Sequence, residues 1–215
     1  MLRPILTALF VLLLGTLAAL RTQPVRSQPY TLSQSSRLWL SGTSTLNAFE
    51  CQAKKLRLDH GVDHVIEGSG FTMPGVSLVV PINNLDCDNR RMNKDLRAAL
   101  QADVFPEIRL DVFRIEMPWD VAGDAEKNGR PRVTLYGTMS LAGSSREVTI
   151  RLTSWLDDMK RLHGQGSLEV RMTDFGVEPP TALFGLVKAH DDILIRFHLM
   201  ADPDTPTADA PAGTP

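Results

Sequence analysis

The chain has 215 residues, with 23 lysines and arginines against 25 aspartates and glutamates, and 43% of its residues are hydrophobic. This length is enough for one ordinary domain whose core needs few crosslinks. A formal net charge of −2 argues against nucleic-acid binding, which requires a clustered basic surface. Two cysteines are too few for a disulfide-framework miniprotein or a cysteine-rich zinc ribbon. The composition therefore predicts a single soluble domain and leaves its activity open.

The first 27 residues have the pattern of a secretion signal. Arg3 provides a positive charge, and the segment from Ile5 to Leu20 is an almost unbroken apolar run of 16 residues. That run is short for a transmembrane helix, which needs about 20 residues, and is typical of the core of a signal peptide. We therefore predict a signal peptide over 1–27 and export of the protein. The alternative is an uncleaved N-terminal anchor.

The composition of the C-terminal residues predicts a disordered tail. Residues 202–215 contain no large apolar side chain. Such a segment cannot bury enough surface to offset the entropy lost on ordering. We therefore expect a disordered tail over 202–215 and a folded domain over 28–201.

From residue 37 onward, apolar and polar residues alternate with a period of two, which is typical of strands with one buried face. In the first half of the domain this alternation predicts strands over Arg37–Thr45, Cys51–Leu58 and Val76–Ile82.

A histidine pair lies between the last two of these strands. His60 and His64 are four residues apart, with Asp59 and Asp63 interleaved. On a helix this spacing could chelate a metal. Because Gly61 and the flanking strands favour a loop over a helix, we predict a solvated turn here.

The segment Asn89–Ala102 departs from the period of two. Apolar residues recur in it at the spacing of a helix, at Met92, Leu96, Ala99 and Leu100. Asn89 is a suitable N-cap, and Phe105-Pro106 follows closely enough to end the helix. The sequence therefore predicts one helix.

Alternation resumes after the helix. It predicts strands over Ile108–Met117, Leu162–Met172 and Asp192–Met200, and an antiparallel hairpin formed by residues 133–141 and 148–152. About eight short antiparallel strands are typical of a sandwich or an up-and-down barrel. An eight-stranded barrel can enclose one small ligand. The predicted class is thus all-β with one short helix.

Alternation also predicts which side chains face the interior. The set consists of Ile108, Leu110, Leu135, Met139, Leu141, Val148, Ile150, Ile193, Ile195 and Phe197. Phe175 and Phe184 are expected to contribute near a loop beside the barrel wall. Filled and hollow barrels share the same alternation, so these residues either surround a ligand or fill a solid core.

Cys51 and Cys87 are the two cysteines of the chain. In an exported protein the oxidising compartment favours a disulfide between them, and the alternative is two buried free thiols. Because the chain has no Cys-x-x-Cys motif, we expect a structural role for the pair.

The sequence lacks the usual motifs of a hydrolase. It has no Gly-x-Ser-x-Gly elbow and no spacing that supports a Ser–His–Asp set. The paired carboxylates Asp157-Asp158 and Asp191-Asp192 lie at predicted strand ends, where aspartate is an ordinary turn residue. His163, His190 and His198 are scattered without the spacing of metal ligands. The sequence therefore predicts neither an enzyme nor a metal site.

Several segments occur along the domain in a recognisable order. They are Leu40-Ser-Gly-Thr-Ser-Thr-Leu46, Met92-Asn-Lys-Asp-Leu96 with Phe105-Pro-Glu-Ile108, Gly137-Thr-Met-Ser-Leu-Ala-Gly-Ser-Ser-Arg-Glu-Val148, and Arg171-Met-Thr-Asp-Phe-Gly176 with Asp191-Asp-Ile-Leu-Ile195. These segments are distributed over roughly residues 38–200, nearly the whole domain, and the ordered set resembles the YceI-like family of exported lipid-binding proteins.

This resemblance implies an eight-stranded antiparallel, lipocalin-like β-barrel with a helix closing one end. It also implies a long apolar tunnel that holds an amphiphilic lipid, a polyisoprenoid or a quinone-like molecule, in the periplasm or secreted from the bacterial envelope. We therefore expect a lipid carrier without catalysis, cofactor or metal, with no nucleic-acid partner and only transient membrane contact. The alternative is a filled barrel that acts as a structural or protein-interaction module of the envelope.

Overall fold

The computed structural model describes residues 30–68, 71–117, 130–182 and 186–203. The predicted signal peptide, Phe184 and residues 204–215 of the predicted tail lie outside this part of the chain. In order, the elements are β1 (Tyr30–Leu32), β2 (Arg37–Ser44), β3 (Ala48–Ala53), β4 (Arg57–Gly68), β5 (Phe71–Pro81), η1 (Ile82–Asn84), β6 (Leu85–Asp86), α2 (Arg90–Ala99), β7 (Glu107–Glu116), β8 (Arg132–Leu141), β9 (Ser144–Leu156), β10 (Leu162–Arg171), η2 (Met172–Phe175), β11 (Thr181–Ala182) and β12 (Val187–Pro203).

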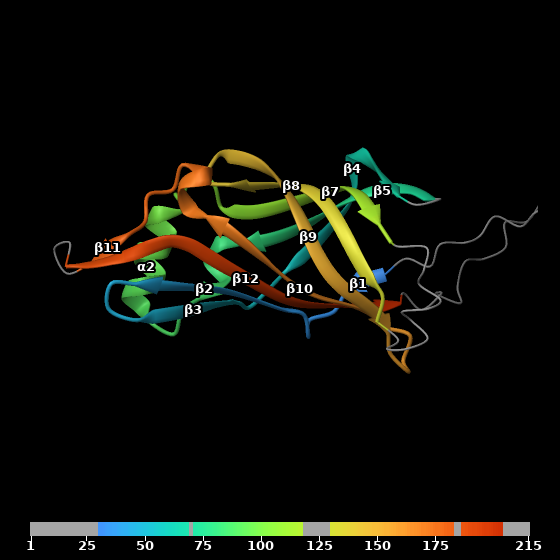
Figure 1. The fold of residues 1–215 in the computed structure, drawn as a ribbon, viewed down its shortest axis with the longest axis horizontal. Helices are drawn as coiled ribbons and strands as arrows, with labels where there is room; N and C mark the ends of the chain where they lie inside the picture. Colours follow the sequence, from blue (N-terminus) through green and yellow to red (C-terminus); the bar gives the residue numbers. More distant parts are fainter. Residues whose placement is uncertain (1–29, 69–70, 118–129, 183–185, 204–215) are drawn as a thin grey trace, which may run out of the picture.

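All the strands belong to one strongly curled sheet (Figure 1). Neighbouring strands follow the order β4-β5-β7-β8-β9-β10-β12-β2-β3-β6, and the short strands β1 and β11 pair with β12. Pairing is antiparallel except for a parallel contact of β4 with β7 at Glu67 and Gly68. The sheet forms a half-barrel, which confirms the predicted all-β barrel type with one helix. Its described residues form 12 strands instead of the predicted eight.

The β8–β9 hairpin shows how the sequence builds this sheet. Its turn residues Ala142 and Gly143 have positive φ values of 48° and 78°, as tight hairpin turns require. The register pairs Leu135 with Ile150, so that apolar residues of both strands face the interior. This hairpin confirms the prediction from alternation.

Helix α2 begins where the sequence predicts it. Asn89 has an extended backbone, and its side chain accepts hydrogen bonds from the N–H groups of Arg91 at 2.9 Å and Met92 at 3.1 Å. The cap satisfies two donors that the first turn leaves free. The helix ends before the predicted Ala102 because Gln101 adopts a φ of 51°, outside the helical region.

The predicted single strand over Cys51–Leu58 was wrong. Strand β3 ends at Ala53, and β4 begins at Arg57. Between them the Lys54 N–H donates to the carbonyl of Asn84 at 2.9 Å, which extends the pairing of β3 with β6 past the last β2 pair, Ala53 with Leu38. The end of β3 is thus bonded to a segment thirty residues later.

The predicted turn around His60 and His64 was also wrong, because both residues lie within β4. The register of β4 against β5 shifts between His60 and Val62 and again between Val62 and Val65. Such bulges let a strand accommodate Gly61 and continue.

Strand β12 extends through the residues at the end of the predicted domain. Pro203 pairs with Tyr30 and Asp202 pairs with Thr31, two residues beyond the predicted boundary at 201. At the other end of the curled sheet, α2, η2 and β11 lie together (Figure 1). These elements border the candidate functional site.

Candidate functional site

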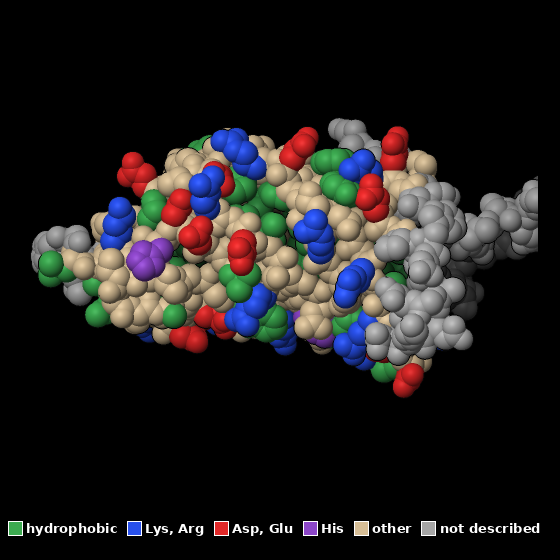
Figure 2. All heavy atoms as spheres, in the orientation of Figure 1, with side chains coloured by type: hydrophobic (Ala, Val, Ile, Leu, Met, Phe, Trp, Pro, Cys, Tyr) green, Lys and Arg blue, Asp and Glu red, His purple; other side chains and the backbone are tan. Residues whose placement is uncertain are grey.

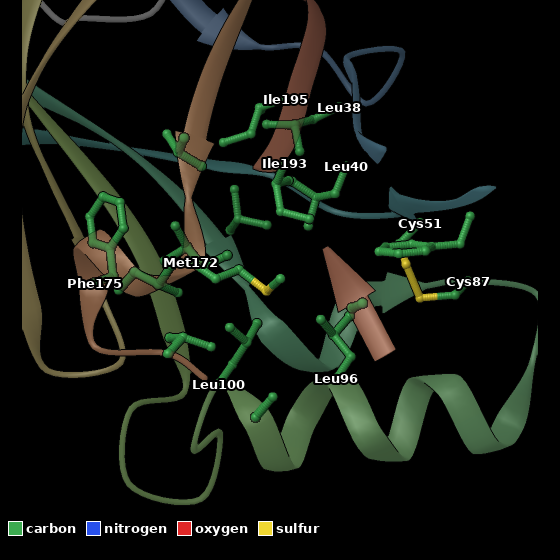
Figure 3. Close-up of a pocket in the computed structure, with 18 of the residues that line it drawn as sticks. Leu38, Leu40, Cys51, Cys87, Leu96, Leu100, Met172, Phe175, Ile193 and Ile195 are labelled. Atoms are coloured by element: carbon green, nitrogen blue, oxygen red, sulfur yellow. A yellow bond between two sulfur atoms is a disulfide. The ribbon is translucent and has the colours of Figure 1, made fainter. Parts of the chain in front are cut away.

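The concave face of the sheet and helix α2 surround a cavity of about 470 Å3 (Figure 3). Apolar side chains from β2, β3, β5, β7, β8, β9, β10 and β12 form most of its wall. Pockets that bind drug-sized molecules have volumes of roughly 300–1,000 Å3. The interior is therefore hollow enough for a ligand.

Most of the predicted interior side chains lie on the wall of this cavity. Those that line it are Ile108, Leu110, Leu135, Met139, Leu141, Ile150, Phe175, Ile193, Ile195 and Phe197. Val148 packs against the buried core instead. Phe184 lies outside the described residues.

Sequence reasoning missed a large part of the wall. The missed residues include Leu38, Leu40, Leu78, Val80, Leu152, Leu168 and Val170 on strands, Met92, Leu96 and Ala99 on α2, and Leu100 at the C-cap of α2. On the strands the signal was the same alternation that identified the other residues. On the helix the apolar stripe was recognised, and the structure turns that stripe toward the cavity.

Cys51 and Cys87 form a disulfide, which confirms the prediction. Both cysteines also line the cavity (Figure 3). The bond joins β3 to the segment directly before the N-cap of α2, so it fastens the helix to the barrel wall.

A polar network reinforces that attachment. The Asn93 side-chain carbonyl accepts from the Cys87 N–H at 2.8 Å, and its amide donates to Asp86 Oδ1 at 2.8 Å. Lys54 Nζ lies 2.5 Å from the other oxygen of Asp86. The hydrogen bonds from Lys54 and Asn93 lower the pKa of Asp86 to about 2.

Polar side chains that border the cavity gather at one end. They are Ser44, Asn47, Asn89, Arg91, Asp95, Arg171 and Thr181, most of them exposed to solvent. We call this end the mouth. Arg171 there is 2.8 Å from Asp174, and this hydrogen bond raises the pKa of Arg171. The opposite end, which we call the far end, is lined by Leu152, Gly164 and Leu199.

A second group of interacting side chains lies outside the cavity. His163 Nδ1 is 3.0 Å from His198 Nε2, and His163 Nε2 is 3.1 Å from Asp157 Oδ2. Trp155 stacks on both imidazoles. Burial, with the nearby His163 and Arg130, lowers the pKa of His198. Within the described ranges, no group of three or more His, Cys, Asp and Glu side chains is arranged to hold a metal ion.

One carboxylate of each predicted pair, Asp157 and Asp191, has structural partners. Asp157 accepts from the backbone N–H groups of Met159 and Arg161 in the β9–β10 turn, as predicted for a turn residue. Asp191 and Asp192 were expected at a strand end but lie within β12. Asp191 accepts from the N–H of Thr173 at 2.9 Å and from its hydroxyl, which lowers the pKa of Asp191 and ties η2 to β12.

The sequence profile of the YceI-like domain matches residues 35–201. The solved structure of Burkholderia cenocepacia BcnA is 16% identical, with a TM-score of 0.58 over 77% of this chain and 95% of that one. A polyisoprenoid binding domain from Saccharophagus degradans, implicated in plant cell wall breakdown, is 14% identical, with a TM-score of 0.59 over 82% and 99%.

The Campylobacter jejuni YCEI protein is 12% identical, with a TM-score of 0.51 over 72% of this chain and 85% of that one. At such identities the structural similarity shows a shared fold. No curated protein matches the chain significantly. Among the residues with described positions, no helix is both long and apolar enough to cross a membrane.

Proposed function

The chain belongs to the YceI-like family, and from this premise we propose that its cavity holds the tail of an amphiphilic, isoprenoid-type lipid without catalysing a reaction. The observation that carries the proposal is a cavity of about 470 Å3 whose described lining is apolar along its length, with its polar side chains gathered at the mouth. The polyisoprenoid binding domain of Saccharophagus degradans, which shares the fold, supports the same class of ligand.

The energetics suit a hydrocarbon tail. Removing each CH2 from water contributes about 0.8 kcal/mol, and this gain requires no specific hydrogen bond. A wall of leucine, isoleucine, valine and phenylalanine provides such burial. Polar groups at the mouth would then border the head group, while the tail extends toward the far end.

We further propose that the protein works in the periplasm or outside the cell. The predicted signal peptide supports export. The Cys51–Cys87 disulfide also supports it, because disulfides persist in oxidising compartments.

The test is native mass spectrometry of the protein purified from its own envelope without detergent, followed by organic extraction. A co-purifying prenyl lipid is expected. Ile193→Asn places an amide on the cavity wall at a half-buried position and should remove that lipid. Leu194→Asn is the matched control, because Leu194 is the half-buried neighbour on the outer face.

Two results would overturn the proposal. One is a ligand-free protein that also fails to take up added polyprenols or quinones. The other is equal loss of lipid from both asparagine variants with unchanged melting temperatures. Either result would favour the alternative of a structural or protein-interaction module.

A further inference from the structure

Two exposed leucines project at the mouth end of the protein. Leu46, between β2 and β3, is 72% exposed, and Leu186, just before β12, is 80% exposed. The Thr45 N–H donates to the carbonyl of Lys188 at 2.9 Å, and the Lys188 N–H donates to the Thr45 hydroxyl at 3.2 Å. These bonds join the β2–β3 turn to the start of β12, so both leucines belong to one platform.

The apolar surface of this platform is continuous with the cavity. Leu46 both projects into solvent and lines the cavity, and Val187, next to Leu186, also lines it. Figure 2 shows hydrophobic side chains at the end of the molecule where Figure 1 places β11 and the β2–β3 turn. An apolar chain leaving the mouth would therefore meet these side chains first.

Helix α2 adds positive charge beside the same opening. It carries Arg90, Arg91, Lys94 and Arg97 against a single acid, Asp95, whereas the whole chain has a net charge of −2. Even when the exposed Asp88 ahead of the helix is counted, two positive charges remain in excess. Charge of this sign complements the phosphates of an anionic lipid surface.

The opposite end of the molecule has exposed apolar side chains without these features. Leu156, at the end of β9, is 55% exposed and Met159, in the β9–β10 turn, is 69% exposed, and the acids Asp157 and Asp158 of this turn are balanced by Lys160 and Arg161. Strand β9 has 13 residues, a length of about 40 Å along the chain at about 3.3 Å per residue, and runs between this turn and the neighbourhood of η2. This turn therefore serves as an internal comparison.

We propose that the mouth end docks on an anionic lipid bilayer. Leu46 and Leu186 enter the headgroup region, and the exposed cations Arg90, Arg91 and Lys94 of α2 meet the lipid phosphates. The mouth then faces the membrane, and a lipid tail passes between bilayer and cavity without crossing water. The inference rests on the proposed function, because it supplies the route by which that lipid enters and leaves.

The test is flotation of the full-length purified protein with vesicles of phosphatidylglycerol and phosphatidylcholine in equal parts, without isoprenoid. Leu186→Ser, at a position that does not line the cavity, should weaken vesicle binding about tenfold. The double variant Arg90→Gln/Lys94→Gln should weaken it about 30-fold and remove the preference over pure phosphatidylcholine. Met159→Ser is the matched control and should bind as the unmodified protein does.

Failure of the unmodified protein to float with the anionic vesicles would overturn the inference, and so would equal weakening by Met159→Ser and Leu186→Ser. Uptake of a polyprenol delivered from cyclodextrin, in the absence of vesicles, tests the cavity separately. This uptake should be the same for Leu186→Ser and the unmodified protein. Normal flotation without uptake would refute the proposed function while leaving docking in place.

Discussion

Gly164→Leu should shorten the cavity without disturbing the sheet. Gly164 lies in β10 and lines the far end. A Cβ atom added there would meet only the Cδ1 of Leu152 within 4 Å, at an ordinary contact distance of 3.9 Å. A leucine side chain can therefore extend into the cavity. The replacement also removes the entropic cost of a glycine inside a strand.

The size of the effect follows from the carbon atoms displaced. A leucine side chain has four carbons, so it excludes nearly one five-carbon isoprene unit of a tail that reaches the far end. At about 0.8 kcal/mol per buried CH2, the loss is about 3 kcal/mol, or roughly 100-fold in affinity. A tail that is one unit shorter should bind the variant and the unmodified protein equally.

The assay is a titration of both proteins with polyprenols of graded length, together with thermal unfolding. Gly166→Leu is the control for steric strain, because a Cβ at Gly166 would lie 2.8 Å from the Arg151 carbonyl oxygen and 2.8 Å from the ring of Phe197. This control should melt at a lower temperature, whereas Gly164→Leu should not. Unchanged affinity of Gly164→Leu for every tail length would refute the placement of the tail.

Three further predictions concern stability. Replacing Cys51 and Cys87 by serine should lower the free energy of unfolding by roughly 3–4 kcal/mol in urea titrations, because the disulfide closes a loop of 36 residues. The pKa of Asp86 is lowered from 3.8 to about 2, so its contribution to folding stability is complete above pH 3.8 and is lost as the pH falls toward 2. The melting temperature of Asp86→Asn should therefore lack this fall between pH 3.8 and 2. Burial lowers the pKa of His198 below 6.5, so the free energy of unfolding should decline as the pH falls through 6.5. His198→Gln should reduce this decline when unfolding is followed by the fluorescence of Trp155.

Most of the sheet could be predicted from the sequence because one face of each strand is buried, which imposes the period of two. The β8–β9 hairpin shows this clearly, since the pairing of residues 133–141 with 148–152 was predicted, and the structure extends the second strand to Ser144–Leu156. The break between β3 and β4 carries no such local signal. At this break the Lys54 N–H bonds to Asn84, and a contact between distant segments does not alter the periodicity of the sequence.

Groups that come together across the sheet were harder to predict. His163 and His198 are 35 residues apart, and they meet because β10 and β12 pair with Gln165 opposite His198. The sequence gives the positions of both histidines, but it does not show which residues of β10 and β12 pair with one another. The same limit applies to the mouth, where Arg91 of α2 and Arg171 of β10 border one opening.

An apolar cavity, unlike a catalytic site, requires no particular residue at any one position of the sequence. A filled core and a hollow one require the same apolar residues on the same faces, so the difference lies in the volume left between them. Volume-conserving changes among leucine, isoleucine and methionine usually cost little. A site that works by apolar burial is therefore specified by summed volumes and by the few positions where space is left, such as Gly164. Alternation could thus identify wall residues such as Met139 and Ile193, whereas the space that they enclose required the structure.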